Sequence, residues 1–216
     1  MGANVPLTPY QWSANRNTSR AAPLPPAIRP LPPTNEWVNV HTLGVKGDGT
    51  TDDTAAIQAA IDGHPVLYFP SGHYTIHDTL TLKPDTVLIG LHPTLTQFDL
   101  PDGTPGYQGV GAPKPVLSAP AAGHNILSGF GVFTGTTNPR AVGILWKAGE
   151  DSLIDDVRML GGAGLNPYVG YHFPNSPPAA RWGGQYPSIW VTDGGGGTFA
   201  DIWTPDTIAQ EGFYVS

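Results

Sequence analysis

Short apolar segments, each followed by Gly, Pro, Asp or Ser, recur along most of this sequence. Examples are 66–69, 86–89, 142–146 and 188–192. Segments this short are typical of β-strands, because helices need longer periodic runs. The 28 glycines and 24 prolines among 216 residues provide turns between them. The sequence therefore predicts an all-β domain, built as a sandwich, a barrel or a solenoid.

A polar residue at the centre of two apolar segments favours the solenoid. Asp155 and Asp156 interrupt the segment 153–159, and Asp201 interrupts 199–203 in the same way. In a parallel coil, alternate residues point inward, the chain bends at the polar position, and successive coils stack like residues on like. We therefore expect stacked parallel coils, although the segments follow no strict period.

One amphipathic helix is expected over residues 53–62. Ile57, Ala60 and Ile61 have the i, i+3, i+4 spacing that places apolar side chains on one helix face. Asp52 or the threonine before it is positioned to cap the start of the helix. A glycine and a proline directly after this segment end it. From there on the apolar period changes to two, which is the period of strands.

The N-terminal part of the chain differs from the rest. Residues 1–36 contain eight prolines, which lack the N–H needed for a strand ladder and prefer extended conformations. We expect 1–36 to form a linker or a strap, and 37–216 to form the β-domain. Residues 213–216 resemble a strand without a cap after it. We therefore expect this domain to be incomplete at its C-terminal end, where further β-helix sequence or a partner chain would cover the edge.

Composition excludes several classes of partner and site. The net charge of −7 and the absence of a Lys/Arg cluster argue against nucleic acid and against anionic membranes. No apolar run approaches the roughly 18 residues that a membrane span needs. The chain has no cysteine, so disulfides and thiolate metal sites are excluded. No signal peptide is visible in residues 1–10, so either the protein is cytoplasmic or a signal for export lies on a longer parent chain.

A specific resemblance covers residues 43–90. The run 43–61, LGVKGDGTTDDTAAIQAAI, closely resembles the opening signature of pectate-lyase-like β-helix proteins of the rhamnogalacturonase/epimerase type. The run 68–74, YFPSGHY, and the segment 80–90 match the next two blocks in the same order. The resemblance implies a right-handed parallel β-helix, a single-stranded solenoid whose first coil is capped by the helix at 53–62. Its signature residues brace turns, so it identifies a fold rather than a reaction.

The resemblance also implies a class of function. Proteins with this signature include exo-β-1,3-glucanases, pectin- and rhamnogalacturonan-degrading enzymes, uronate epimerases and phage tailspikes. The segment 189–199, IWVTDGGGGTF, is similar to a glycoside-hydrolase-like bacterial branch with two β-helices per chain. These resemblances imply a secreted, extracellular or cell-surface protein that acts on a polysaccharide. A glycoside hydrolase for a β-glucan or pectin-type substrate is the first expectation. A polysaccharide lyase and a non-catalytic glycan-binding or structural module are the alternatives.

Three carboxylates are candidate catalytic groups. Glycoside hydrolysis requires two carboxyl groups about 5–10 Å apart. Asp193 ends a predicted strand before four glycines, Glu211 precedes the last predicted strand, and Asp156 belongs to an Asp-Asp pair. Each also has a structural interpretation: a turn at Asp193, a solvated turn at Glu211 and the coil bend at Asp156. The other motifs of polygalacturonase-like enzymes are missing, which keeps the non-catalytic module open.

Aromatic side chains are the candidate sugar-binding groups, because flat rings pack against sugar rings. Three tryptophans each follow an aliphatic residue in a predicted strand, so alternation places them outward if their neighbours point inward. They are Trp146, Trp190 and Trp203, after Leu145, Ile189 and Ile202. Trp182 and Tyr186 belong to the long segment 165–186, which we expect to leave the coils as a loop and line a groove. The alternative is that loops or a partner chain cover these rings.

No metal ion or cofactor is expected. His73 and His77 lack the HExxH spacing and a third ligand of a zinc site. The Gly-Phe-Gly sequence at 129–131 lacks the third glycine and the following helix of a dinucleotide site.

Overall fold

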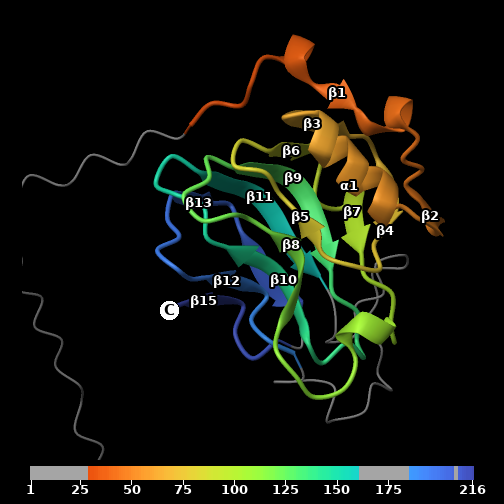
Figure 1. Ribbon diagram of the computed structural model, residues 1–216, viewed down its shortest axis with the longest axis vertical. Coiled ribbons are helices and arrows are strands. Elements are labelled where there is room, and N and C mark those ends of the chain that lie inside the picture. Colours follow the sequence, from red (N-terminus) through yellow and green to blue (C-terminus); the bar gives the residue numbers. More distant parts are fainter. Residues whose placement is uncertain (1–28, 161–184, 207–208) are drawn as a thin grey trace, which may run out of the picture.

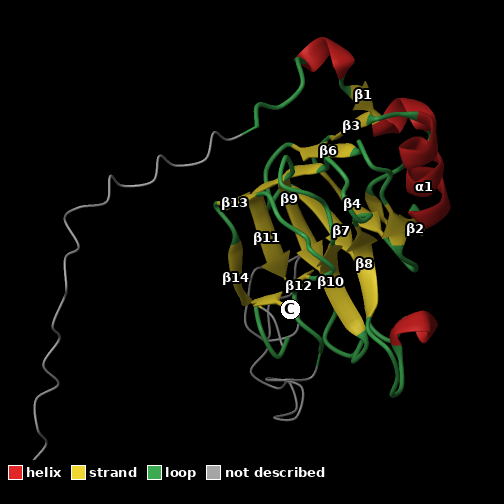
Figure 2. Ribbon diagram, turned by 60° about the vertical axis from the view of Figure 1, so that its left-hand side comes forward, coloured by secondary structure: helices red, strands yellow, loops and turns green. Residues whose placement is uncertain are grey.

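The computed structural model describes residues 29–160, 185–206 and 209–216 of the 216-residue chain. All strand pairs among these residues are parallel. They form a ten-stranded and a five-stranded sheet, which wind around a common axis (Figures 1 and 2). Crossovers between parallel strands are right-handed. The expected right-handed parallel β-helix is thus confirmed.

Each coil of the helix contributes up to three strands, which define three faces. Face 1 consists of β1 (Val38–Asn39), β3 (Val66–Phe69), β6 (Val87–Gly90), the first halves of β9 (Ile126–Phe133) and β11 (Leu153–Leu160), and β13 (Thr198–Ala200). Face 2 consists of β2 (Asp48–Asp52), β4 (Gly72–Thr75), β7 (Thr96–Asp99), the second halves of β9 and β11, and β14 (Trp203–Asp206). Face 3 is the five-stranded sheet of β5 (Leu80–Thr81), β8 (Lys114–Ser118), β10 (Ala141–Trp146), β12 (Ile189–Val191) and β15 (Phe213–Val215).

The bend between faces 1 and 2 uses left-handed backbone. Gly129, Asp156 and Asp201 have φ values of 74°, 50° and 48°. They stack in successive coils, because Ser128 pairs with Asp155 and Asp155 pairs with Ala200. Asp tolerates this conformation better than most residues with a side chain. The expected bend at Asp156 is therefore present.

The core consists of columns of like residues inside the coils. On face 1, Leu67, Leu88, Leu127 and Ile154 occupy one register column, and all four side chains are fully buried. Each buried aliphatic side chain of this size contributes about 1.5–3 kcal/mol relative to an exposed one. This column is the stacking of like residues that the sequence predicts.

A helix takes the position of a face 3 strand in the first coil. Helix α1 (Thr54–Gly63) packs against β5 and buries Ile57, Ala60 and Ile61. The Asp53 carboxylate, 1% exposed, accepts hydrogen bonds of 2.8 Å from the backbone N–H groups of Lys46 and Gly47. The predicted capping helix and the bracing role of Asp53 are thus confirmed. Short 3₁₀ helices occur at Thr34–Glu36, Val40–Leu43 and Pro105–Tyr107.

The two ends of the predicted β-domain have different surroundings. Arg29 donates hydrogen bonds to the carbonyls of His124 and Asp151, so the start of the described chain lies against the turns that precede β9 and β11. Residues 1–28 lie outside the described residues, and the division at residue 36 stays a prediction. At the other end, Phe213 and Val215 continue inward columns but are 40% and 63% exposed. Coverage of this edge by further coils or a partner chain also stays a prediction.

None of the helices among the described residues is both long enough and apolar enough to span a bilayer.

Candidate functional site

The outer surface of face 3 gathers aromatic side chains. Ile144 and Ile189 are in register and point into the core, so the residues that follow them point outward. Leu145, Trp190 and Tyr214 form this outward register column across β10, β12 and β15. Because the strands are parallel, the column runs along the axis of the β-helix (Figure 1).

Trp190 is the centre of an aromatic row, which we define as Tyr186, Trp190 and Tyr214. The rings of Tyr186 and Trp190 are stacked, with centroids 6.3 Å apart and planes 13° apart. Tyr214 approaches Trp190 edge-on at 5.9 Å. The indole N–H of Trp190 donates to Ser216 Oγ at 3.1 Å, and Ser216 Oγ contacts Thr192 Oγ1 at 3.2 Å. These contacts hold the indole ring in one orientation on the surface.

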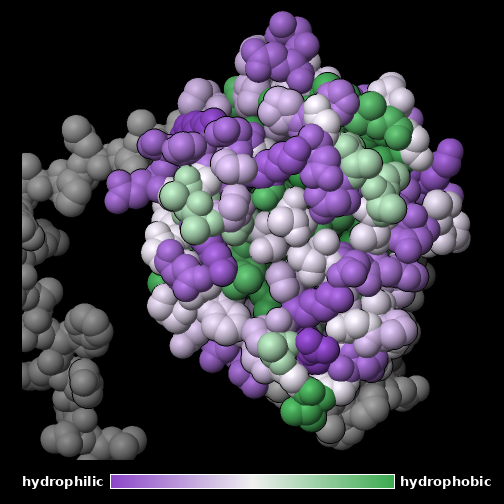
Figure 3. Space-filling view, viewed as in Figure 1, coloured by the Kyte–Doolittle hydropathy of each residue, from purple (hydrophilic) through white to green (hydrophobic). Residues whose placement is uncertain are grey.

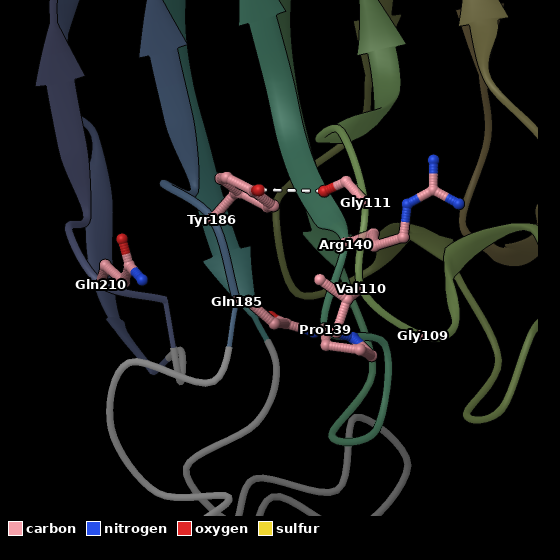
Figure 4. A pocket seen from close by; sticks show the side chains of 8 residues that line it. All are labelled: Gly109, Val110, Gly111, Pro139, Arg140, Gln185, Tyr186 and Gln210. Atoms are coloured by element: carbon pink, nitrogen blue, oxygen red, sulfur yellow. Dashed lines mark hydrogen bonds between the residues drawn. The ribbon is translucent and has the colours of Figure 1, made fainter.

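An open pocket of about 240 Å³ lies at the amino end of face 3 (Figure 4). Tyr186 forms part of its wall, and its hydroxyl donates to Gly111 O at 3.0 Å, which ties the row to the loop before β8. Arg140 lines the same pocket, and its Nε donates to Ala112 O at 2.9 Å. Gln185 is buried at the base, where its amide donates to Thr134 O and Gly135 O. The pocket is therefore continuous with the aromatic row and has a rigid base.

A second, smaller pocket of about 220 Å³ lies at the bend between faces 1 and 2. Its lining includes His92, Asp156, Asp201 and Trp203, which is 56% exposed. The pKa of Asp156 is raised, mainly by burial and further by the neighbouring carboxylates, while His92 opposes the shift. Burial and Asp201 raise the pKa of Asp155 as well. This cluster of carboxyl groups has the electrostatic character of an acid or base site.

The three predicted catalytic carboxylates do not meet. Asp193 follows β12, where its Oδ2 atom lies 2.7 Å from Lys147 Nζ. Glu211 precedes β15 with an exposed side chain, and its backbone carbonyl accepts from Ser188 N at 2.9 Å. At about 3.3 Å per residue, the paired strands separate these two by roughly 20 Å, which is too far for a glycosidase pair. Asp156 lies at the bend, on a different side of the helix.

The predicted outward orientation of Trp146 is wrong. Its side chain is 0% exposed, packs against Phe199 and donates its indole N–H to Gly196 O at 2.9 Å. Leu145, and not Trp146, is in register with Trp190 on the outer surface. When two adjacent residues of a strand are both apolar, the sequence does not show which of them points inward. A shift of one residue exchanges the inward and outward sides of the strand. Trp146 therefore belongs to the core and offers no sugar-binding surface.

The other aromatic predictions differ in outcome. Trp190 and Tyr186 come together in one row, and Trp203 points outward on face 2, away from them. Trp182 lies outside the described residues. Sequence reasoning missed Tyr214, although the alternation Phe-Tyr-Val in its strand would have placed it outward. It also missed His92, for which the sequence offered no signal.

Among residues 29–160, 185–206 and 209–216, no group of three or more His, Asp or Glu side chains is arranged to hold a metal ion.

Comparison with known proteins identifies related sequences. The family model described as rhamnogalacturonase A/epimerase, pectate lyase-like, matches residues 37–159. Alginate lyase 7 of Azotobacter vinelandii is 40% identical over 77 residues, which are 30% of this chain and 9% of that protein. A glucan 1,3-beta-glucosidase of Cochliobolus carbonum is 34% identical over 61 residues, 26% of this chain and 8% of that protein. The chain thus spans less than a tenth of these relatives.

The A-module of the mannuronan C-5 epimerase AlgE4 of Azotobacter vinelandii aligns with a TM-score of 0.49 at 21% identity, covering 83% of this chain and 53% of that one.

Proposed function

Because the chain belongs to the rhamnogalacturonase A/epimerase, pectate lyase-like family of carbohydrate-active β-helix proteins, we propose that it takes part in polysaccharide processing by holding a polysaccharide chain on face 3. The observation that carries this proposal is the stacking of Trp190 on Tyr186, with Tyr214 beside them. A polysaccharide is too large to enter a cell intact, so we propose action outside the cell or at its surface.

The aromatic row has the properties that a sugar platform needs. Its rings are only partly buried, so ring surface remains available to a ligand. The hydrogen bond from Trp190 to Ser216 fixes the indole before binding, which reduces the ordering cost of binding. Trp190 and Tyr214 lie in neighbouring coils along the helix axis, and Tyr186 precedes Trp190 in the same coil, so a glycan on this surface can contact more than one ring.

Affinity electrophoresis against a panel of β-glucans, pectins and alginate tests this proposal. We expect Trp190→Ala to weaken binding by at least about tenfold, the equivalent of about 1.4 kcal/mol. Trp203→Ala is the matched control, because it removes an exposed tryptophan from face 2. Equal retention of the Trp190→Ala variant and the parent protein would contradict the proposal.

A second candidate function is hydrolysis of the polysaccharide, favoured by the raised pKa values of Asp155 and Asp156 beside Trp203. A raised pKa brings a carboxyl group closer to the range in which it can act as a general acid. Release of reducing sugars that is lost in Asp156→Asn would support hydrolysis. Unsaturated products that absorb ultraviolet light would indicate a lyase instead. Binding without turnover would favour a non-catalytic glycan-binding module.

A further inference from the structure

We infer that the polysaccharide held on face 3 is uncharged, without uronate or sulfate groups; this inference rests on the proposed function. A site for an acidic polysaccharide needs cationic side chains whose charge is available to the ligand, because carboxylate recognition depends on charge-assisted hydrogen bonds. The cations around face 3 therefore decide between a neutral and an acidic ligand.

The lysines at face 3 already have carboxylate partners. Lys114, at the start of β8, lies 2.8 Å from Asp78, and Lys147, just after β10, lies 2.7 Å from Asp193. The hydrogen bond from Lys114 also lowers the pKa of Asp78, which favours the ionised form of that carboxylate. A uronate would have to displace one carboxylate to gain another, with little net benefit.

Arg140 is engaged differently, with backbone carbonyls. Its Nε donates to Ala112 O at 2.9 Å and one terminal nitrogen donates to Gly106 O at 3.4 Å. The guanidinium lies on the far side of Gly111 from Tyr186 (Figure 4). It therefore holds the loop before β8 and does not point along the aromatic row. Glu211, before β15 at the same end of the face, adds a negative charge.

The outward side chains beside the row carry hydroxyl groups and rings. Ser118 shares the register column of Leu145 and Trp190, and Thr192 and Ser216 lie next to the indole. Hydroxyl groups bind the hydroxyls of a neutral sugar, and rings bind its apolar side. On the side shown in Figure 3, hydrophobic residues form small separate groups among hydrophilic ones. The net charge of −7 adds long-range repulsion of a polyanion.

Paired binding measurements at low and high ionic strength test this inference. The probes are a neutral β-1,3-glucan, a neutral β-1,4-glucan, polygalacturonate and alginate, each with the parent protein and Trp190→Ala. We expect a neutral glucan to bind, Trp190→Ala to lose at least about tenfold in affinity, and salt to have little effect. Trp190-dependent, salt-sensitive binding of polygalacturonate or alginate would overturn the inference and leave the proposed function intact. If no polysaccharide binds, or if binding does not depend on Trp190, both the inference and the proposed function are overturned.

A variant that frees a lysine at face 3 from its carboxylate partner provides an independent test. Asp193→Asn removes the partner of Lys147 and suits the left-handed φ of 53° at this position. We expect this variant to gain salt-sensitive retention by alginate. Asp85→Asn makes the same change in net charge at an exposed carboxylate beside face 1, and it is expected to gain none. Equal gain in both variants, or no gain in Asp193→Asn, would show that the ion pair at face 3 does not set the charge preference.

Discussion

Gln58 of helix α1 forms a pair of hydrogen bonds with the backbone of Thr81 in β5. Its Nε2 donates to Thr81 O at 3.1 Å, and its Oε1 accepts from Thr81 N at 2.9 Å. One side-chain amide thus replaces the two bonds that a neighbouring strand would supply. An unpaired strand edge is a site of aggregation, so this contact explains how a helix can close a stack of strands.

Replacement of Gln58 is expected to weaken the cap. Gln58→Met keeps the length of the side chain and removes both bonds, so we expect the free energy of unfolding to fall by about 1–2 kcal/mol. Chemical denaturation measures this loss, and Gln58→Glu, which turns the donor into a carboxylate oxygen facing Thr81 O and Asp62, is expected to lose stability as well. A Met variant as stable as the parent would show that the cap relies on Ile57 and Ile61 alone.

Replacement of Trp146 is expected to affect stability, and replacement of Trp190 in the next coil is expected to affect glycan binding. Trp146 is fully buried and bonded to Gly196 O, so Trp146→Ala is expected to cost about 3–5 kcal/mol of stability. Trp190→Ala is expected to cost much less stability and to lose glycan binding. Thermal unfolding of both variants checks this contrast, and a larger loss for Trp190→Ala would reverse the assignment of inside and outside.

The bend between faces 1 and 2 leaves no room for a side chain at Gly129. This glycine has a φ of 74°, and a Cβ atom would lie 2.6 Å from Gly90 O. Gly129→Ala is therefore expected to lose about 1–2 kcal/mol of stability to left-handed strain and more to the clash. Gly103→Ala, with a φ of 71° and open space around it, is expected to lose only the part due to strain. Denaturation midpoints should rank Gly129→Ala below Gly103→Ala; equal midpoints would contradict the close approach.

Stability at the bend is expected to depend on pH through Asp156. Burial raises its pKa in the folded protein, and Asp155 and Asp201 add to this while His92 opposes it. A carboxyl group with a raised pKa stabilises the fold fully below the unfolded pKa of about 3.9, and this contribution is lost as pH rises through the folded pKa. Asp156→Asn should therefore be more stable than the parent at neutral pH, and the difference should shrink in acid. Urea denaturation across pH measures it, and a difference that grows in acid would contradict the shift.

Local signals allowed much of the fold to be predicted. The spacing of Ile57, Ala60 and Ile61 lies within one helix, and the turn residues lie next to the strands that they end. The signature at 43–61 adds the handedness and the position of the cap. These features involve residues close in sequence, so the sequence alone was sufficient for them.

The candidate site depends on contacts that no local pattern contains. Trp146 and Trp190 have similar neighbours in the sequence, yet one is buried and the other lies on the surface. The register between β10 and β12 decides this, and register is a relation between strands from different coils. The separation of Asp193 from Glu211 follows from the same registers.

The amino-acid sequence by itself indicated short strands, stacked coils and one helix through short-range periodicity and turn chemistry, and the resemblance of its signature implied the handedness of the coils, the helical cap and the class of related proteins. The tertiary structure alone decided which rings share a surface and which lysines have carboxylate partners. The physical reason is that stacking coils brings together side chains such as Trp190 and Tyr214, or Lys147 and Asp193, whose proximity arises from the winding of the chain.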